Sequence, residues 1–366
     1  MQKKGRLDKY FPGSNSSRGF YSLYQYLPPE DTEKILILKG GPGVGKSTFM
    51  RRTGEEMRAE GREVEYHYCA SDSSSLDGVV IPQISTAIMD GTAPHIIDPL
   101  YPGVVEEIIN LGEFWQRKLL LEKKGPILEL NRSLKREFKM AYHRLAEARG
   151  VLKEIRELGN RKENQIQNQK ILHRLQTQLL DGLSPQLSGQ PQERHHFISA
   201  LTPKGPVNHL ENLMQGKKKI FLLQGEPGAR WQPVLRGLAR RSKELGLELE
   251  IYRCPLSPEE YDHLVLPQMD CAIIKDLELF QLSNKLPEDS RIEEIQVRYI
   301  LAEGASKQEL EKAKERFKLL IQRAISRLKR ARELHQKLEE CYHPAMDFQA
   351  LEKRRKEIRE ELLSQL

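Results

Sequence analysis

The residues that could do chemistry are concentrated in one loop near the start of the chain. The stretch EKILILKGGPGVGKST carries the complete pattern G-x-x-x-x-G-K-[ST]. Glycines allow backbone N–H groups to converge on phosphate oxygens, the lysine reaches the β- and γ-phosphates, and the hydroxyl binds Mg²⁺. We therefore expect a nucleotide-binding loop in which Lys46 is catalytic and Ser47 is a magnesium ligand. The loop comprises Gly40, Gly41, Pro42, Gly43, Val44, Gly45, Lys46, Ser47 and Thr48.

A P-loop enzyme also needs an acidic side chain at the end of a neighbouring strand, where it organises the shell of the Mg²⁺ ion. Asp90 follows the apolar run 87–89 and comes 44 residues after Lys46. This spacing suits a strand, helix, strand and helix before the strand that ends at the acid. Asp90 is therefore predicted to be catalytic and to hold the metal through water.

Three further polar residues lie where strands are expected to end. Asp72 and Asp77 stand in a polar loop after the predicted strand 64–69, where they could position a water or a second substrate. A capping role for Asp77 is equally open. His95 could sense the γ-phosphate, or it could be an ordinary histidine in a turn.

The strand and loop that carry the pattern occur twice. Aligned at a shift of 185 residues, 17 of the 58 positions in 34–91 are identical to those in 219–276. The shared residues include Gly40 with Gly225 and Asp77 with Asp262. This similarity predicts an internal duplication.

The second copy has lost the residues that the chemistry requires. Trp231 replaces the P-loop lysine, Gln232 replaces the serine, and Lys275 replaces the strand-end acid. The second loop is therefore predicted to persist for its fold alone. Arg230 leaves one option open, a phosphate contact made locally or across the interface between copies.

The elements that must position these loops follow from the rest of the chain. Each copy precedes a charged segment with apolar residues at heptad spacing, which predicts a helical hairpin with coiled-coil packing. The fold class expected is α/β, with two tandem P-loop NTPase-like domains, each a parallel sheet with flanking helices. The predicted boundaries are 1–112 for the first copy, 113–182 for its hairpin, 183–194 for a linker, 195–290 for the degenerate copy and 291–366 for the second hairpin.

Composition limits the setting of the protein. The 366 residues carry a formal net charge of +7, and the four cysteines occur singly. No stretch of about 18 apolar residues predicts a membrane span. A reduced cytoplasmic protein without a membrane partner is expected, and the mixed charges of its helices make nucleic-acid binding possible but not favoured.

Taken together, the motifs resemble a poorly characterised bacterial family of tandem P-loop ATPases. The resemblance rests on GGPGVGKST, LDGVVIP, AIMDGTAPH and DPLYPG in the first copy, and on TPKGPV, GEPG and PAMDF in the second. It implies an ATP-binding protein whose second substrate or protein partner is unidentified, and it favours ATP over GTP.

These observations predict a nucleoside triphosphatase with one competent Mg-ATP site that hydrolyses ATP to drive a conformational change. Two alternatives stay open. One is a kinase that phosphorylates a small molecule or nucleoside, with Asp72 or Asp77 binding the acceptor. The other is a nucleotide-gated module that binds RNA or protein without significant turnover.

Overall fold

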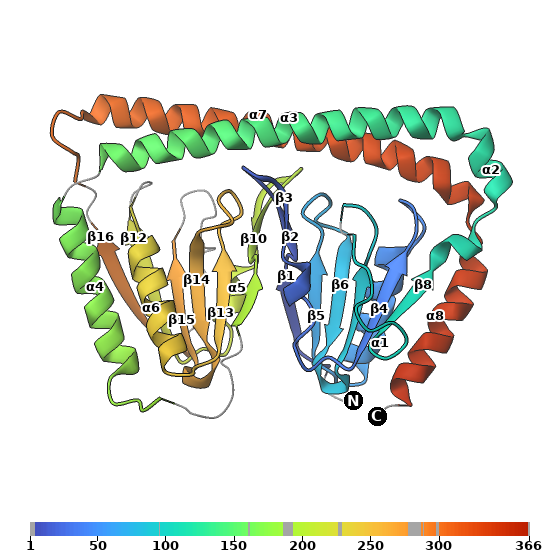
Figure 1. Ribbon diagram of the computed structural model, residues 1–366, viewed down its shortest axis with the longest axis horizontal. Helices are drawn as coiled ribbons and strands as arrows, with labels where there is room; N and C mark the ends of the chain where they lie inside the picture. The colour runs from blue at the N-terminus through green and yellow to red at the C-terminus, as the bar shows by residue number, and fades with distance from the viewer. Residues whose placement is uncertain are drawn as a thin grey trace.

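The computed structural model describes residues 4–94, 96–159, 162–185, 193–225, 229–276, 287, 289–297 and 300–364. Two six-stranded sheets lie side by side beneath a pair of long helices (Figure 1). The mixed α/β class predicted from the sequence is confirmed.

The first half of the chain forms one six-stranded sheet, against which one helix, α1, packs. Its elements are β1 (Leu7–Tyr10), β2 (Gly13–Ser16), β3 (Gly19–Ser22), β4 (Lys34–Lys39), α1 (Lys46–Ala59), β5 (Val64–Tyr68), β6 (Leu76–Ile81), β7 (Thr86–Asp90) and β8 (Glu106–Asn110). The strand order is β1-β5-β6-β7-β4-β8, and β2 and β3 form a separate hairpin.

The second half repeats this arrangement. Its elements are β9 (Glu193–His196), β10 (Ser199–Thr202), β11 (Gly205–Asn208), α5 (Leu210–Met214), β12 (Lys219–Gly225), α6 (Gln232–Glu244), β13 (Leu249–Arg253), β14 (Tyr261–Leu266), β15 (Cys271–Lys275) and β16 (Arg291–Val297). The order β9-β13-β14-β15-β12-β16 matches that of the first sheet, strand for strand.

The prediction of a wholly parallel sheet is wrong at one strand in each half. β6 runs antiparallel to both β5 and β7, while β4 pairs in parallel with β7 and β8. The predicted helix between β5 and β7 is replaced by β6. Only the short 3₁₀ turn Pro82–Ile84 and Ser85 connect β6 to β7, and so short a connection permits an antiparallel hairpin but no parallel crossover.

The helices do not form the two separate hairpins predicted for 113–182 and 291–366. After α2 (Arg117–Glu122), α3 (Lys124–Leu158) packs along α7 (Lys307–Tyr342), and together they cross above both sheets (Figure 1). The next helices then descend on opposite halves. α4 (Lys162–Leu180) packs on α6 of the second half, and α8 (Phe348–Leu363) packs on α1 of the first.

The length of the long helices explains this crossing. At 1.5 Å per residue, a helix of 35 residues extends about 50 Å, far enough to carry the chain from one half to the other. Its apolar seam buries Leu145 and Ala148 with Leu320 and Ala324 of α7. The heptad pattern of α3 thus correctly predicted packing against another helix. The predicted partner lay within 113–182, whereas the observed partner is α7.

The predicted boundaries differ in places from the observed elements. Position 112 falls inside the 3₁₀ turn η3 (Leu111–Phe114), and the segment 291–366 begins with β16. Of the predicted linker 183–194, residues 186–192 lie outside the described part of the chain, and β9 begins at Glu193.

The two halves meet edge to edge where β1 and β9 end. Phe11 and Phe197 exchange backbone hydrogen bonds of 2.8 and 3.2 Å. The Tyr10 ring stacks on His196 with centroids 4.7 Å apart. Arg194 of the second half makes a two-pronged ion pair with Glu65 of the first, at 3.1 and 3.0 Å.

No described helix is both long enough and apolar enough to span a lipid bilayer.

Candidate functional site

The loop between β4 and α1 carries the predicted phosphate-binding residues. Gly43 and Gly45 have φ angles of 69° and 94°, in the left-handed region where a Cβ is disfavoured. The second of these glycines directly precedes the first residue of α1, Lys46. Glycines therefore shape the loop so that the N-terminus of a 14-residue helix opens into it.

Lys46 is held inside the loop. Its Nζ donates to the carbonyl oxygens of Gly40 and Gly41 at 2.9 and 2.8 Å. The same atom lies 3.6 Å from Asp90 Oδ2, and both side chains are largely buried. The structure thus brings together the predicted lysine and the predicted acid.

Strand pairing accounts for the position of Asp90. β7 pairs with β4 in parallel, and Asp90 lies opposite Leu38. The predicted phosphate-binding loop begins where β4 ends. Asp90 Oδ1 accepts a hydrogen bond of 2.8 Å from the backbone N–H of Thr92. The carboxylate is therefore fixed at the carboxyl edge of the sheet, where ligands bind in open α/β folds.

Thr92 is a residue that sequence reasoning missed. Its hydroxyl donates to the Gly40 carbonyl at 2.9 Å, and the Gly40 N–H lies 3.3 Å from the same oxygen. Thr92 thus ties the start of the P-loop to the end of β7. The sequence offered one signal for Thr92, its position two residues after the predicted acid Asp90.

Ser47 faces the start of β6. Its Oγ accepts a hydrogen bond of 2.9 Å from the Leu76 backbone N–H. A serine hydroxyl and an aspartate carboxylate are oxygen donors of the kind that Mg²⁺ prefers. Together with the Lys46 ammonium, these groups could bind a metal-complexed polyphosphate and stabilise the charge that develops during phosphoryl transfer.

Asp72 and Asp77 do not share one polar loop, contrary to the expectation. Asp72 lies in the loop before β6, accepts hydrogen bonds from Ser74 and Ser75, and pairs with Arg332 of α7 at 2.8 Å. Although burial opposes ionisation, these hydrogen bonds and Arg332 lower the pKa of Asp72. Its carboxylate is therefore engaged in linking the first half to α7.

Asp77 lies within β6 and is buried. Burial raises the pKa of this carboxyl to about 6, against hydrogen bonds from Tyr24 and Cys69 and the charge of Lys46, which lower it. Asp77 therefore lies within the sheet and not in the predicted loop, and its role toward a second substrate stays a prediction.

The two remaining candidates are apart from the P-loop or outside the described residues. His95 lies outside the described residues. Arg230 pairs with Glu157 of α3 at 2.5 Å, and its carbonyl accepts a hydrogen bond from Asn168 of α4. The structure therefore directs Arg230 toward the helices that cover the second half.

In the second half, an apolar ring stands in the position of the P-loop lysine. Trp231 is only 2% exposed and belongs to the core formed by α4, α6 and the second sheet. Gln232 hydrogen-bonds both the N–H and the carbonyl of Tyr261. It thereby keeps the link to the next strand that Ser47 makes with Leu76.

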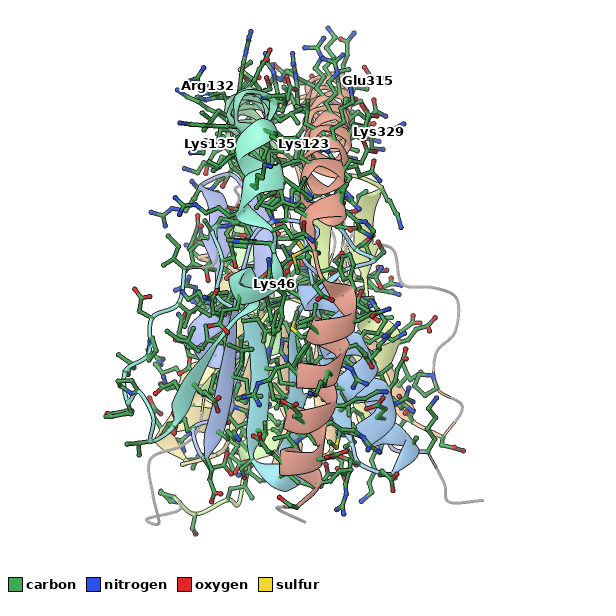
Figure 2. The ribbon with its side chains drawn as sticks, turned by 90° about the vertical axis from the view of Figure 1, so that its right-hand side faces the viewer. Lys46, Lys123, Arg132, Lys135, Glu315 and Lys329 are labelled. Carbon is green, nitrogen blue, oxygen red and sulfur yellow. The ribbon has the colours of Figure 1, made fainter. Side chains whose placement is uncertain are left out.

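The P-loop of the first half is covered by the turn between α7 and α8, which contains the 3₁₀ segment η5 (His343–Ala345). A side chain at Gly41 would meet the Tyr342 ring at 2.7 Å, and one at Gly43 would meet the Glu339 backbone at 3.0 Å. A side chain at Gly45 would meet Leu351 at 3.0 Å. Figure 2 shows Lys46 below the long helices that carry Arg132 and Lys329.

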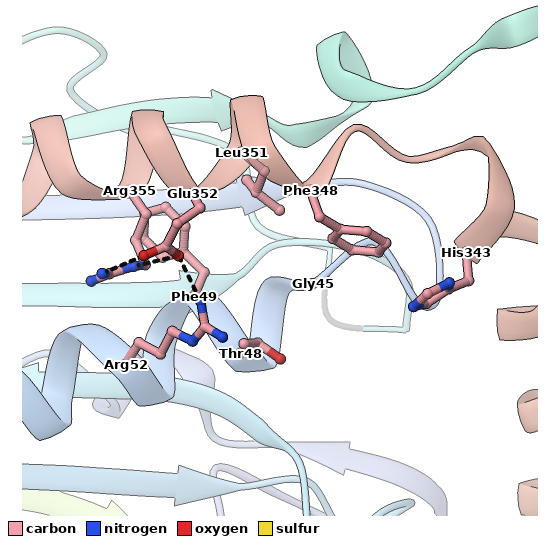
Figure 3. Close-up of a pocket in the computed structure, with 9 residues that line it drawn as sticks. All are labelled: Gly45, Thr48, Phe49, Arg52, His343, Phe348, Leu351, Glu352 and Arg355. Atoms are coloured by element: carbon pink, nitrogen blue, oxygen red, sulfur yellow. Dashed lines mark hydrogen bonds and ion pairs between the residues drawn. The ribbon is translucent and has the colours of Figure 1, made fainter.

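A cavity of about 260 Å³ lies between this turn and the start of α1. Figure 3 shows its walls converging from α1 on one side and from η5 and α8 on the other. The lining residues are Gly45, Thr48, Phe49, Arg52, His343, Phe348, Leu351, Glu352 and Arg355. Sequence reasoning did not assign these C-terminal residues to the site, although the stretch PAMDF, which ends at Phe348, was part of the family resemblance.

Comparisons with known proteins add one partial similarity. Residues 23–83 match the family model described as Nephrocystin 3, N-terminal. This segment contains β4, the P-loop and α1, but it is less than a fifth of the 366 residues. Neither the curated proteins nor the solved structures include a significant match.

Proposed function

We propose that the protein is a Mg-ATP-binding P-loop NTPase with one competent site, in the first half of the chain. The observation that carries the proposal is the joint placement of Lys46 and Asp90, 3.6 Å apart, at the N-terminus of α1. In the second half, the corresponding positions hold a buried tryptophan and a lysine. We further propose that the halves are duplicated P-loop domains, on the basis of their sequence identity and common strand order.

Binding would require Lys46 to exchange its partners. Its ammonium now donates to two uncharged carbonyl oxygens of its own loop, which an anionic β- or γ-phosphate oxygen would replace as acceptor. The N–H groups at the start of α1 would add donors along the polyphosphate.

Ser47 and Asp90 would hold the metal, Ser47 directly and Asp90 through water. Bound Mg²⁺ would neutralise charge on the phosphate oxygens. The Ser47 hydroxyl accepts one hydrogen bond, from the Leu76 N–H, and its second lone pair would be available to the metal. Lys46 would then stabilise negative charge on the transferring phosphoryl group. Hydrolysis to ADP and phosphate, followed by release of these products, would free the loop.

Contacts between the P-loop and α7 support a role for turnover in conformational change. The Tyr342 ring and the Glu339 backbone leave no room for a side chain at Gly41 or Gly43, so a shift of the loop would displace the end of α7. Because α7 extends to the second half, nucleotide state in one half would reach the other through one continuous helix. Cytoplasmic location and an unidentified partner are part of this proposal.

Calorimetric titration with Mg-ATP, followed by assay of phosphate release, tests the function. We expect one site per chain in the wild type, loss of that site in Lys46→Ala, and retention in Arg230→Ala, which removes the cation of the second loop. Phosphate release should follow the same pattern. Binding that survives Lys46→Ala, or is lost only in Arg230→Ala, would overturn the assignment.

A further inference from the structure

We propose that the cavity between α1 and the α7–α8 turn holds the base of the nucleoside triphosphate, with Phe348 as its stacking surface. This inference rests on the proposed nucleotide site and adds a subsite to it. The base-binding residues would then come from the C-terminal helix, which follows the second half in the chain.

The cavity is continuous with the phosphate loop. Gly45 and Thr48 line it and also belong to the predicted nucleotide-binding loop 40–48. A triphosphate seated at the N-terminus of α1 therefore has this cavity directly beside it. At about 260 Å³, the space is below the roughly 300–1,000 Å³ of sites that enclose an entire drug-sized ligand. It suits one part of the nucleotide.

Its apolar walls favour a flat ring. Phe49 of α1 and Leu351 of α8 are buried, and the partly exposed Phe348 ring lies between α8 and the P-loop, 3.6 Å from the position of a Gly45 side chain. His343 stands 4.7 Å from the Phe348 ring, centroid to centroid. Aromatic side chains stack on nucleobases of any identity because every base presents a π-face.

The charged residues at the other end argue against an anion in the cavity. Arg355 pairs with Glu56 at 2.8 and 2.9 Å and with Glu352 at 2.8 Å. Arg52 pairs with the same Glu352 at 2.9 Å (Figure 3). Both cations are thus compensated, and the cavity offers a neutral floor.

The test compares two ligands that differ in having a base. Mg-ATP and Mg-tripolyphosphate are titrated into wild type, Phe348→Ala and Phe348→Trp, with Leu362→Ala as a control. Leu362 is fully buried on the same helix and in the same core but does not line the cavity, so it reports loss of packing alone.

We expect Phe348→Ala to weaken ATP binding about 10- to 100-fold, the range that loss of one base–aromatic stack gives. Tripolyphosphate affinity should change less than twofold, and Phe348→Trp should retain ATP affinity. Leu362→Ala should leave both ligands within about twofold. Equal losses for ATP and tripolyphosphate, or unchanged ATP affinity in Phe348→Ala, would overturn the base pocket. Wild-type protein that binds neither ligand would instead refute the nucleotide site itself.

Discussion

The Lys275 ammonium lies 3.1 Å from the Asp262 carboxylate, at the strand ends of the second sheet. In the first sheet, the corresponding positions hold Asp90 and Asp77, and the cation is Lys46 of the P-loop. The second half therefore has no lysine at the position of Lys46 and has one instead at the end of the neighbouring strand. A buried cation is present in each half, although it comes from a different element.

Replacing Lys275 with alanine should destabilise the protein by about 3–5 kcal/mol, because Asp262 is 1% exposed and would become a buried charge without its cation. Chemical denaturation measures the free energy of unfolding. The double variant Lys275→Ala/Asp262→Asn should recover part of the loss, since it removes the charge. A single-variant loss below 1 kcal/mol would show that the pair is not important for stability.

Asp90→Asn should separate turnover from binding. The amide keeps the shape of the side chain but removes the charge proposed to organise the metal, so we expect phosphate release to fall about 100-fold or more. ATP affinity should change less than tenfold. Gln232→Ala, a change in the second loop at the position that corresponds to Ser47, should leave the rate unaltered. An unimpaired rate in Asp90→Asn would exclude this carboxylate from the reaction.

The buried Asp77 should make the protein less stable as the pH rises. Its pKa is about 6 in the folded state and near 3.8 in an exposed carboxyl, so the folded state binds the proton more tightly. The stability that the folded state gains from this tighter proton binding is fully present at low pH and is lost as the pH rises through about 6. Between pH 4 and pH 7, the wild type should lose about 2 kcal/mol more than Asp77→Asn does. Parallel pH profiles of the two proteins would contradict this.

His196 should have the opposite effect. Burial, with help from the Arg194 charge and His67, lowers the pKa of His196 well below 6.5, so the unfolded chain takes up the proton first. Its stabilising contribution is full above pH 6.5 and is lost as the pH falls. We expect His196→Phe, which keeps a ring against Tyr10, to lose about 2 kcal/mol less than the wild type between pH 7 and pH 5. Denaturation at each pH measures the difference, and an equal loss in both proteins would refute it.

Sequence reasoning located the glycine-rich loop before α1 and the strand that ends at Asp90 because both depend on local patterns. Glycine at the left-handed positions 43 and 45 is a requirement of the backbone, and the apolar run before Asp90 is a buried strand wherever the neighbouring strands lie. β6 was not accessible in this way: a helix was predicted between β5 and β7, and a short apolar run cannot be distinguished from a buried helical segment by its periodicity.

The packing of α7 and α8 over the loop could not be predicted from the sequence, for a different reason. A heptad pattern indicates that a helix packs against another helix, but it does not identify that helix. Arg355 meets Glu56 across 299 positions of chain, and neither residue belongs to a motif. Phe348 stands next to the P-loop only because α7 crosses from one half to the other.

The crossing of α3 and α7 has a consequence for how the protein is made. Met346, Leu351, Ile358 and Leu362 fill the core of the first half, yet they follow the entire second half in the chain. During synthesis, which proceeds from the N-terminus, the first sheet leaves the ribosome long before the helix that seals it. The nascent first half should thus have an exposed apolar face until α8 has been synthesised, and the proposed nucleotide site should be completed only then.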